Sequence, residues 1–219
     1  VTRFRVGDRV FGLRTFRFGT HAESVCVKER GSIATMPAGW SFAQAAAVCD
    51  GMMLAHNYVR RIDFAKQRRL LVNGASGSIG SAAVQMARAG GARITATTKT
   101  AAIDLVKSLG ADEVVDYTRE DLRQRAGVDG TFDVVLDAVG KWTFGSCRHL
   151  LAPGGVYYST ELGPSWQNPL LALVTPLFGG RRVGFPVPTD SMEDVEYFKR
   201  LIEEGKYRAV IDRTWGFEE

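Results

Sequence analysis

Cysteine is scarce in this sequence. There are three, Cys26, Cys49 and Cys147, and no two of them have the spacing C-x-x-C. An odd number of isolated cysteines excludes a framework of disulfides and a structural zinc lobe built from four cysteines. Scattered thiols are typical of a reducing compartment, so the sequence predicts a cytoplasmic protein.

Long hydrophobic runs and concentrated charge are missing as well. The longest apolar stretch, Pro169–Phe178, contains Pro176 and is far shorter than the ~20 residues that cross a bilayer. The net charge of +4 is spread along the chain, and no nucleic-acid-binding motif occurs. The expected partner is therefore a small-molecule substrate, with no nucleic acid and no membrane.

The pattern along the chain changes near Arg69. Before it, Phe4–Phe11 and Ala22–Lys28 have β-like patterns. Ser41 with Gln44 forms a capping box that opens a helix at Phe42–Cys49, and another helical stretch follows through Val59. After it, strand patterns alternate with helical ones. Strands are expected at 70–73, 93–97, 114–116, 133–137, 155–159 and 182–185, and helices at 79–89, 101–109, 120–125, 142–150 and 192–204. This alternation predicts an α/β fold with a doubly wound parallel sheet.

A glycine-rich turn, Asn73–Gly80 (NGASGSIG), joins the first of these strands to its helix. Its glycines have the spacing G-x-x-G-x-x-G, which permits a tight turn, close approach of the backbone to a pyrophosphate and close packing of helix on strand. Free N–H groups at the helix start attract phosphates, and Ser76 and Ser78 can add hydroxyl donors. The turn predicts a dinucleotide site, and a glycine turn without a ligand is the alternative.

Two other nucleotide-binding classes lack residues they need. Short-chain dehydrogenases have glycine where Ser78 stands, and they use a Tyr-x-x-x-Lys pair; no tyrosine here has a lysine four residues on. Methyltransferases share a turn like Leu151–Gly155, but they place an acidic residue at the end of the second strand, and none is there. Neither class fits.

The end of the second strand favours a phosphorylated cofactor. It consists of Thr97, Thr98 and Lys99, and the first acidic residue is Asp104, inside the next helix. A carboxylate at the strand end would bind the ribose 2′-hydroxyl of NAD and repel a 2′-phosphate. The absence of such a carboxylate predicts NADP(H) as the cofactor. The alternative is that Lys99 is only a solvated surface lysine.

Seven stretches resemble the medium-chain dehydrogenase/reductases, most closely their zinc-free, quinone oxidoreductase-like branch. They are Gly7–Gly12, Gly19–Ser24, Ser41–Gly51, Leu70–Ala87, Val106–Tyr117, Asp133–Lys141 and Leu150–Thr160. The resemblance implies a partial GroES-like catalytic domain over residues 1–50, a Rossmann domain over 51–208 and a return toward the catalytic domain over 209–219. It also implies a fragment that lacks parts of the family at both termini, so that the GroES-like β-domain is incomplete.

The resemblance further implies the cofactor-binding residues. They are Gly74, Ala75, Ser76, Gly77, Ser78, Ile79 and Gly80 at the pyrophosphate; Thr97, Thr98 and Lys99 at the adenosine ribose with Tyr117 at the 2′-phosphate; and Ala138, Val139, Gly140, Ser159 and Thr160 beside the nicotinamide. Two positions depart from the family: its phosphate-binding cation usually stands near Ala101 or Ala102, and a nicotinamide-contacting threonine is Leu54 here. Many relatives dimerise through the Rossmann domain, so a homodimer is a possible assembly of this protein.

Cys49 matches the place of a zinc-ligating cysteine in zinc-dependent relatives. A catalytic zinc needs three protein ligands, and the interval from Gly12 to Gly39 is too short for the cysteine-rich lobe of those relatives. We therefore expect no metal and interpret Cys49 as a buried thiol. A zinc-dependent alcohol dehydrogenase using Cys49 is the alternative.

Together these features predict an NADPH-dependent oxidoreductase that transfers hydride to a quinone, an enone or a related carbonyl. An NADPH-binding protein with a structural or regulatory role is a further alternative. No general acid can be named from the sequence. Phe16, Phe18 and Trp166 are candidates for an apolar substrate pocket, with core packing as the alternative.

Overall fold

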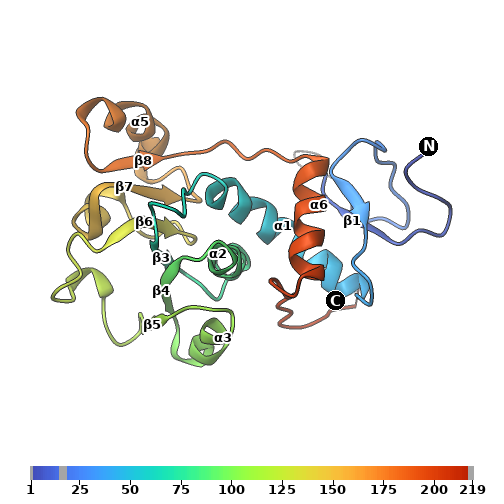
Figure 1. Ribbon diagram of the computed structural model, residues 1–219, viewed down its shortest axis with the longest axis horizontal. Helices are drawn as coiled ribbons and strands as arrows, with labels where there is room; N and C mark the ends of the chain where they lie inside the picture. Colours follow the sequence, from blue (N-terminus) through green and yellow to red (C-terminus); the bar gives the residue numbers. More distant parts are fainter. Residues whose placement is uncertain (1, 15–18, 217–219) are drawn as a thin grey trace. The chain divides into compact units, whose positions relative to one another are not determined.

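The computed structural model describes residues 2–14 and 19–216 (Figure 1). The chain forms two compact units. One unit comprises Val1–Met53 with Pro188–Glu219, and the other comprises Leu54–Val187. The expected boundaries at residues 50 and 208 concern the domains of the whole protein and stay a prediction.

The second unit is built on a six-stranded, all-parallel sheet. Its strands are β3 (Arg69–Asn73), β4 (Arg93–Thr98), β5 (Glu113–Asp116), β6 (Phe132–Asp137), β7 (Leu151–Ser159) and β8 (Arg182–Gly184), in the order β5-β4-β3-β6-β7-β8. This is the 3-2-1-4-5-6 order of the dinucleotide-binding fold, in which the order reverses between the first and fourth strands, here β3 and β6. The predicted doubly wound α/β sheet is confirmed.

Helices and short 3-10 turns connect the strands (Figure 1). They are α2 (Ser78–Ala89), η1 (Thr100–Ala102), α3 (Ile103–Ser108), η2 (Leu122–Gln124), α4 (Phe144–Cys147), η3 (Arg148–Leu150), η4 (Pro164–Trp166), α5 (Gln167–Val174) and η5 (Thr175–Phe178). The helix expected at 120–125 is only the turn η2, because the Asp121 side chain accepts a hydrogen bond from Arg123 N and forms a local turn instead. The helix expected at 142–150 is divided between α4 and η3.

The sheet has a dry core on one face. Leu71, Val135, Leu150, Leu151 and Tyr157 are completely buried there. They come from β3, β6, η3 and β7, so four segments distant in the sequence share one apolar layer. Close packing in this layer fixes the strands relative to one another, which positions the loops that follow them.

The first unit contains the antiparallel pair β1 (Val10–Gly12) and β2 (Ile33–Thr35), the N-terminal part of α1 (Phe42–Val59) and α6 (Met192–Glu203). The predicted capping box is confirmed: Ser41 N donates to Gln44 Oε1 at 2.9 Å and Gln44 N to Ser41 Oγ at 3.2 Å. The two helical stretches expected up to Val59 form one helix.

The strand expected at Ala22–Lys28 does not form. All seven of its residues are exposed. An alternating pattern forms a strand only when a neighbouring strand and an apolar surface receive it. In the described part of this unit β1 and β2 pair only with each other, so the segment has no strand to pair with.

Candidate functional site

A cavity of about 700 Å³ lies at the carboxyl edge of the sheet, where β3, β4, β5 and β6 end. Its lining residues are Asn73, Gly74, Ser76 and Gly77 after β3, Thr97 on β4, Tyr117, Glu120, Asp121, Leu122 and Arg123 after β5, and Ala138, Val139, Lys141 and Trp142 after β6. Open α/β sheets bind ligands at this place, beside the reversal of strand order. The volume is in the range of cofactor sites.

The three glycines of the turn have different structural reasons. Gly74 has φ +80°, and a Cβ there would overlap Val139. A Cβ at Gly80 would overlap the carbonyl of Gly74, so this glycine lets α2 pack onto the turn. A Cβ at Gly77 would make only an ordinary contact of 3.5 Å, with the Gly74 carbonyl. The packing of the protein does not require glycine at 77, where the backbone is exposed to the cavity.

The start of α2 is free to receive an anion. Its N-cap is Gly77, and no side chain accepts a hydrogen bond from the first turn. The first N–H groups of a helix have no partner within it, and the helix dipole places partial positive charge there. An uncapped helix start beside a cavity is a suitable place for phosphate oxygens.

Asp137, at the end of β6, holds the turn that follows it. It is completely buried. Its Oδ1 accepts hydrogen bonds from Asn73 Nδ2 at 2.8 Å, Val139 N at 3.2 Å and Gly140 N at 3.1 Å, and its Oδ2 accepts one from Trp142 N at 2.8 Å. One carboxylate thus joins the turn after β6 to the last residue of β3.

The hydroxyl of Thr97 belongs to the same network. It donates to Asn73 Oδ1 at 2.6 Å and accepts a hydrogen bond from Gly74 N at 3.2 Å. The Thr97 carbonyl accepts one from Ala75 N at 3.0 Å. Thr97 therefore orders the glycine turn. Neighbouring Thr98 is completely buried, and its Oγ1 has no hydrogen-bond partner.

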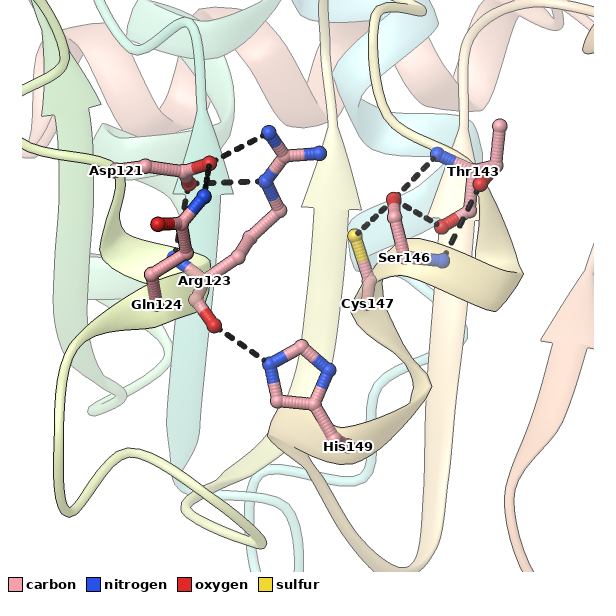
Figure 2. A network of polar contacts seen from close by, with 7 residues as sticks. All are labelled: Asp121, Arg123, Gln124, Thr143, Ser146, Cys147 and His149. Atoms are coloured by element: carbon pink, nitrogen blue, oxygen red, sulfur yellow. Dashed lines mark hydrogen bonds and ion pairs between the residues drawn. The ribbon is translucent and has the colours of Figure 1, made fainter.

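Arg123, one of the residues that line the cavity, is held by Asp121 (Figure 2). Arg123 donates from Nε to Asp121 Oδ1 at 2.9 Å and from Nη2 to Asp121 Oδ2 at 2.7 Å, and its guanidinium carbon lies 5.3 Å from the centre of the Trp142 ring. These hydrogen bonds lower the pKa of Asp121 and raise that of Arg123. Figure 2 also shows His149, whose Nε2 lies 2.8 Å from the Arg123 carbonyl oxygen.

The structure brings part of the expected site together. Of the predicted residues, the cavity is lined by Gly74, Ser76, Gly77, Thr97, Tyr117, Ala138 and Val139, and not by Ala75, Ser78, Ile79, Gly80, Thr98, Lys99, Gly140, Ser159 or Thr160. Lys99 is exposed beside η1, and Ser159 is buried, with its carbonyl accepting a hydrogen bond from Tyr58 Oη at 3.1 Å. The cofactor roles assigned to all these residues stay predictions.

Sequence reasoning did not find the wall formed by Glu120–Arg123, nor the side chains of Lys141 and Trp142. The only local signal was the Asp-x-Arg turn at 121–123, a pattern too common to indicate a site. An acidic residue ending the apolar strand β6 is a clearer signal, since a carboxylate buried there needs donors from the following turn.

Cys49 lies on α1 in the first unit. Its Sγ donates to the Ala45 carbonyl at 3.1 Å, and burial raises the pKa of the thiol to about 11. It lines an apolar cavity of about 380 Å³ that has no histidine, aspartate or glutamate among its described lining residues. Over residues 2–14 and 19–216, no three potential metal ligands come together. The described residues therefore do not by themselves supply a zinc site.

Three aromatic residues, Phe16, Phe18 and Trp166, are the predicted candidates for a substrate pocket. Phe16 and Phe18 lie outside the described residues. Trp166 is 73% exposed on η4 and lines none of the cavities described above.

Within the described ranges, no helix has both the length and the apolar character needed to cross a membrane.

Comparison with known proteins places this chain in a family. A family model described as "Zinc-binding dehydrogenase" matches residues 109–219, just over half of the chain. The chain belongs to the medium-chain dehydrogenase/reductases. The resemblance to the quinone oxidoreductase-like branch of these enzymes is confirmed by the relatives and by the fold.

Medium-chain relatives match the chain over most of its length. The trans-enoyl reductase pgmF of Aspergillus terreus is 29% identical over 245 residues, covering 100% of this chain and 65% of the relative. The chloroplastic NADPH-dependent alkenal/one oxidoreductase of Arabidopsis thaliana is 35% identical, covering 90% of this chain and 46% of the relative. A quinone oxidoreductase structure from Pseudomonas syringae pv. tomato has a TM-score of 0.73 at 26% identity, covering 97% and 68%. The chain thus spans about half to two thirds of the length of these relatives.

Proposed function

We propose that this chain is the cofactor-binding part of an NADPH-dependent oxidoreductase that transfers hydride to a quinone, an enone or a related conjugated carbonyl. The observation that carries the proposal is the glycine turn and uncapped start of α2, which open into the cavity at the reversal of strand order. The names of the relatives, an enoyl reductase, an alkenal/one oxidoreductase and a quinone oxidoreductase, support the acceptor class.

The residues fit a dinucleotide in three parts. The backbone of Ser78–Gly80 at the start of α2 offers N–H groups to the pyrophosphate, Tyr117 bounds the adenosine side after β5, and Ala138–Gly140 follow β6 on the nicotinamide side. When bound, the nicotinamide supplies the hydride chemistry. The chain binds and orients the cofactor, and Asp137 keeps the turn 138–142 in one conformation.

The proposed preference for NADPH over NADH rests on fewer residues than the proposed dinucleotide site itself. No carboxylate ends β4, Tyr117 lines the cavity, and we assign Lys99 and Tyr117 to the 2′-phosphate. Glu120 lines the same cavity and would oppose that phosphate, whereas Asp121 is neutralised by Arg123. We expect Lys99 and Tyr117 to outweigh one exposed glutamate.

A titration of NADPH against NADH, followed by nicotinamide fluorescence, tests this preference. We expect wild type to bind NADPH at least roughly tenfold more tightly, a difference of about 1.4 kcal/mol. Lys99→Ala and Tyr117→Phe should weaken NADPH binding and leave NADH binding unchanged. Equal affinity of wild type for both cofactors would defeat the 2′-phosphate assignment.

Turnover separates the proposed activity from its alternatives. The complete protein should oxidise NADPH with a quinone or an enone. Tight NADPH binding without turnover across quinones, enones and aldehydes would favour a structural or regulatory role. Stoichiometric zinc on which activity depends would favour the alcohol dehydrogenase that uses Cys49.

We also propose a homodimer, formed through α5 and η5. Trp166, Leu170, Leu173, Leu177 and Phe178 are each between 63% and 82% exposed, although isolated soluble domains rarely expose such a run. Residues 162–180 include no charged side chain, so two copies of this surface can meet around a two-fold axis without like-charge repulsion. Ser165 and Trp166 adopt positive φ angles of 52° and 60°, a strained conformation of the kind found at functional surfaces.

A further inference from the structure

The glycine turn lacks a formal positive charge. Residues 73–87 contain no lysine or arginine, so the turn and the first helix offer a phosphate only N–H groups and hydroxyls. A pyrophosphate carries two negative charges that must be removed from water on binding. A hydrogen bond from a lysine or arginine to a phosphate oxygen is charge-assisted and roughly twice as strong as one between neutral groups, so a nearby cation would add to what these N–H groups supply.

Two cations line the cavity in the described structure, Arg123 and Lys141. The charge of Arg123 is already paired, because its guanidinium makes two hydrogen bonds to the Asp121 carboxylate, and the guanidinium also lies over the Trp142 ring. No ion pair joins the ammonium of Lys141 to a carboxylate of the described residues, and the side chain is exposed. Lys141 is therefore the lining cation with its charge available to a ligand.

The position of Lys141 in the sheet favours one phosphate over the others. Its turn follows β6, whose last residue pairs with the last residue of β3 (Asp137 with Asn73). Val139 of the same turn lies against Gly74, and Asp137 holds the backbone on both sides of Lys141. The strands on the adenosine side, β4 and β5, lie on the opposite side of β3. A cation on the turn after β6 is therefore nearer to the turn after β3 than to the end of β4.

We propose that Lys141 is the residue that neutralises the pyrophosphate of the cofactor, acting across the cavity from the glycine turn. This inference rests on the proposed dinucleotide function. It differs from a role in choosing NADPH over NADH, because the pyrophosphate is common to both. Lys141 thus contributes affinity without selectivity, whereas Lys99 and Tyr117 are assigned to selectivity.

Binding by variants tests the inference. Lys141→Gln should weaken NADPH, NADH and ADP by the same factor, roughly tenfold, as expected for the loss of one charge-assisted contact. Lys141→Arg should retain binding within roughly threefold, because the charge is kept. Lys107→Gln is the matched control: it removes an exposed lysine of α3 that does not line the cavity, and it should leave the binding of NADPH, NADH and ADP unchanged. All variants should have the thermal midpoint of wild type, since both lysines are exposed.

The possible results distinguish a failure of the Lys141 assignment from a failure of the proposed function. Unchanged binding of NADH and ADP by Lys141→Gln, with wild type binding both, overturns the assignment of Lys141 and leaves the proposed function standing. Loss of NADPH binding alone also overturns it, because Lys141 would then contact the 2′-phosphate. If wild type binds none of the three ligands, the proposed function fails and the inference fails with it.

Discussion

At the scale of single residues, Asp137 holds the turn after β6 and joins it to the end of β3. Its carboxylate is completely buried and accepts hydrogen bonds from Asn73 and from three backbone N–H groups of the following turn. A buried carboxylate without such donors would be strongly unfavourable. The same four bonds therefore stabilise the aspartate and order the loop that carries Lys141.

Replacing this carboxylate by an amide tests its role. In Asp137→Asn one oxygen becomes an NH₂ group, which cannot accept the bonds now made to that oxygen. Leaving buried donors unpaired should lower the free energy of unfolding by about 2 kcal/mol, measured by urea denaturation. NADPH affinity should also fall.

Asp129→Asn is a suitable control for Asp137→Asn. Its side chain is 81% exposed, and the change should cost less than about 0.5 kcal/mol. Asp137→Asn with the stability and NADPH affinity of wild type would show that the turn is held by other contacts.

At the scale of secondary-structure elements, the junction of β3 and α2 depends on two glycines for different reasons. Gly80 is required by packing, because its missing side chain admits the backbone of Gly74 and Ala75. Gly77 has φ −77° and ψ 170°, which any residue can adopt, and there is room for a Cβ. Any requirement for glycine at 77 must therefore come from a ligand.

Alanine at each position separates packing from binding. Gly80→Ala should destabilise the protein by about 2 kcal/mol, because a helix must shift to admit the methyl group. Gly77→Ala should cost less than about 1 kcal/mol, since it only exchanges one N-cap residue for another. It should nevertheless weaken NADPH binding by at least roughly tenfold, measured by fluorescence titration. Normal NADPH binding by Gly77→Ala would mean that no phosphate approaches the turn there.

At the scale of the whole molecule, the apolar surface of α5 and η5 predicts self-association. Leu173 is 76% exposed, so Leu173→Glu should not disturb the folded chain but should place a charge in the dimer contact. Light scattering coupled to size-exclusion chromatography should give a dimer for wild type and a monomer for this variant. Val6→Glu, at an exposed apolar residue of the first unit, should remain dimeric. A monomeric wild type would refute the proposed dimer.

Local sequence patterns were sufficient to predict most strands and helices of the second unit. The alternation of strand and helix, the glycine turn and the apolar strands predict the parallel sheet, because these features depend on backbone propensity and on burial along a single segment. The capping box of Ser41 and Gln44 is local in the same way. The segment Ala22–Lys28 shows the limit, since its alternation predicts a strand but the described structure provides no partner for it.

The sequence by itself determined the fold class, the glycine turn and the absence of an acid after β4. Only the tertiary structure decided which side chains share the cavity. It brings Glu120–Arg123 and Lys141 to the glycine turn and leaves Lys99 outside the lining. The physical reason is that a strand's pattern specifies its own conformation and buried face, whereas the meeting of loops depends on the order β5-β4-β3-β6 in the assembled sheet.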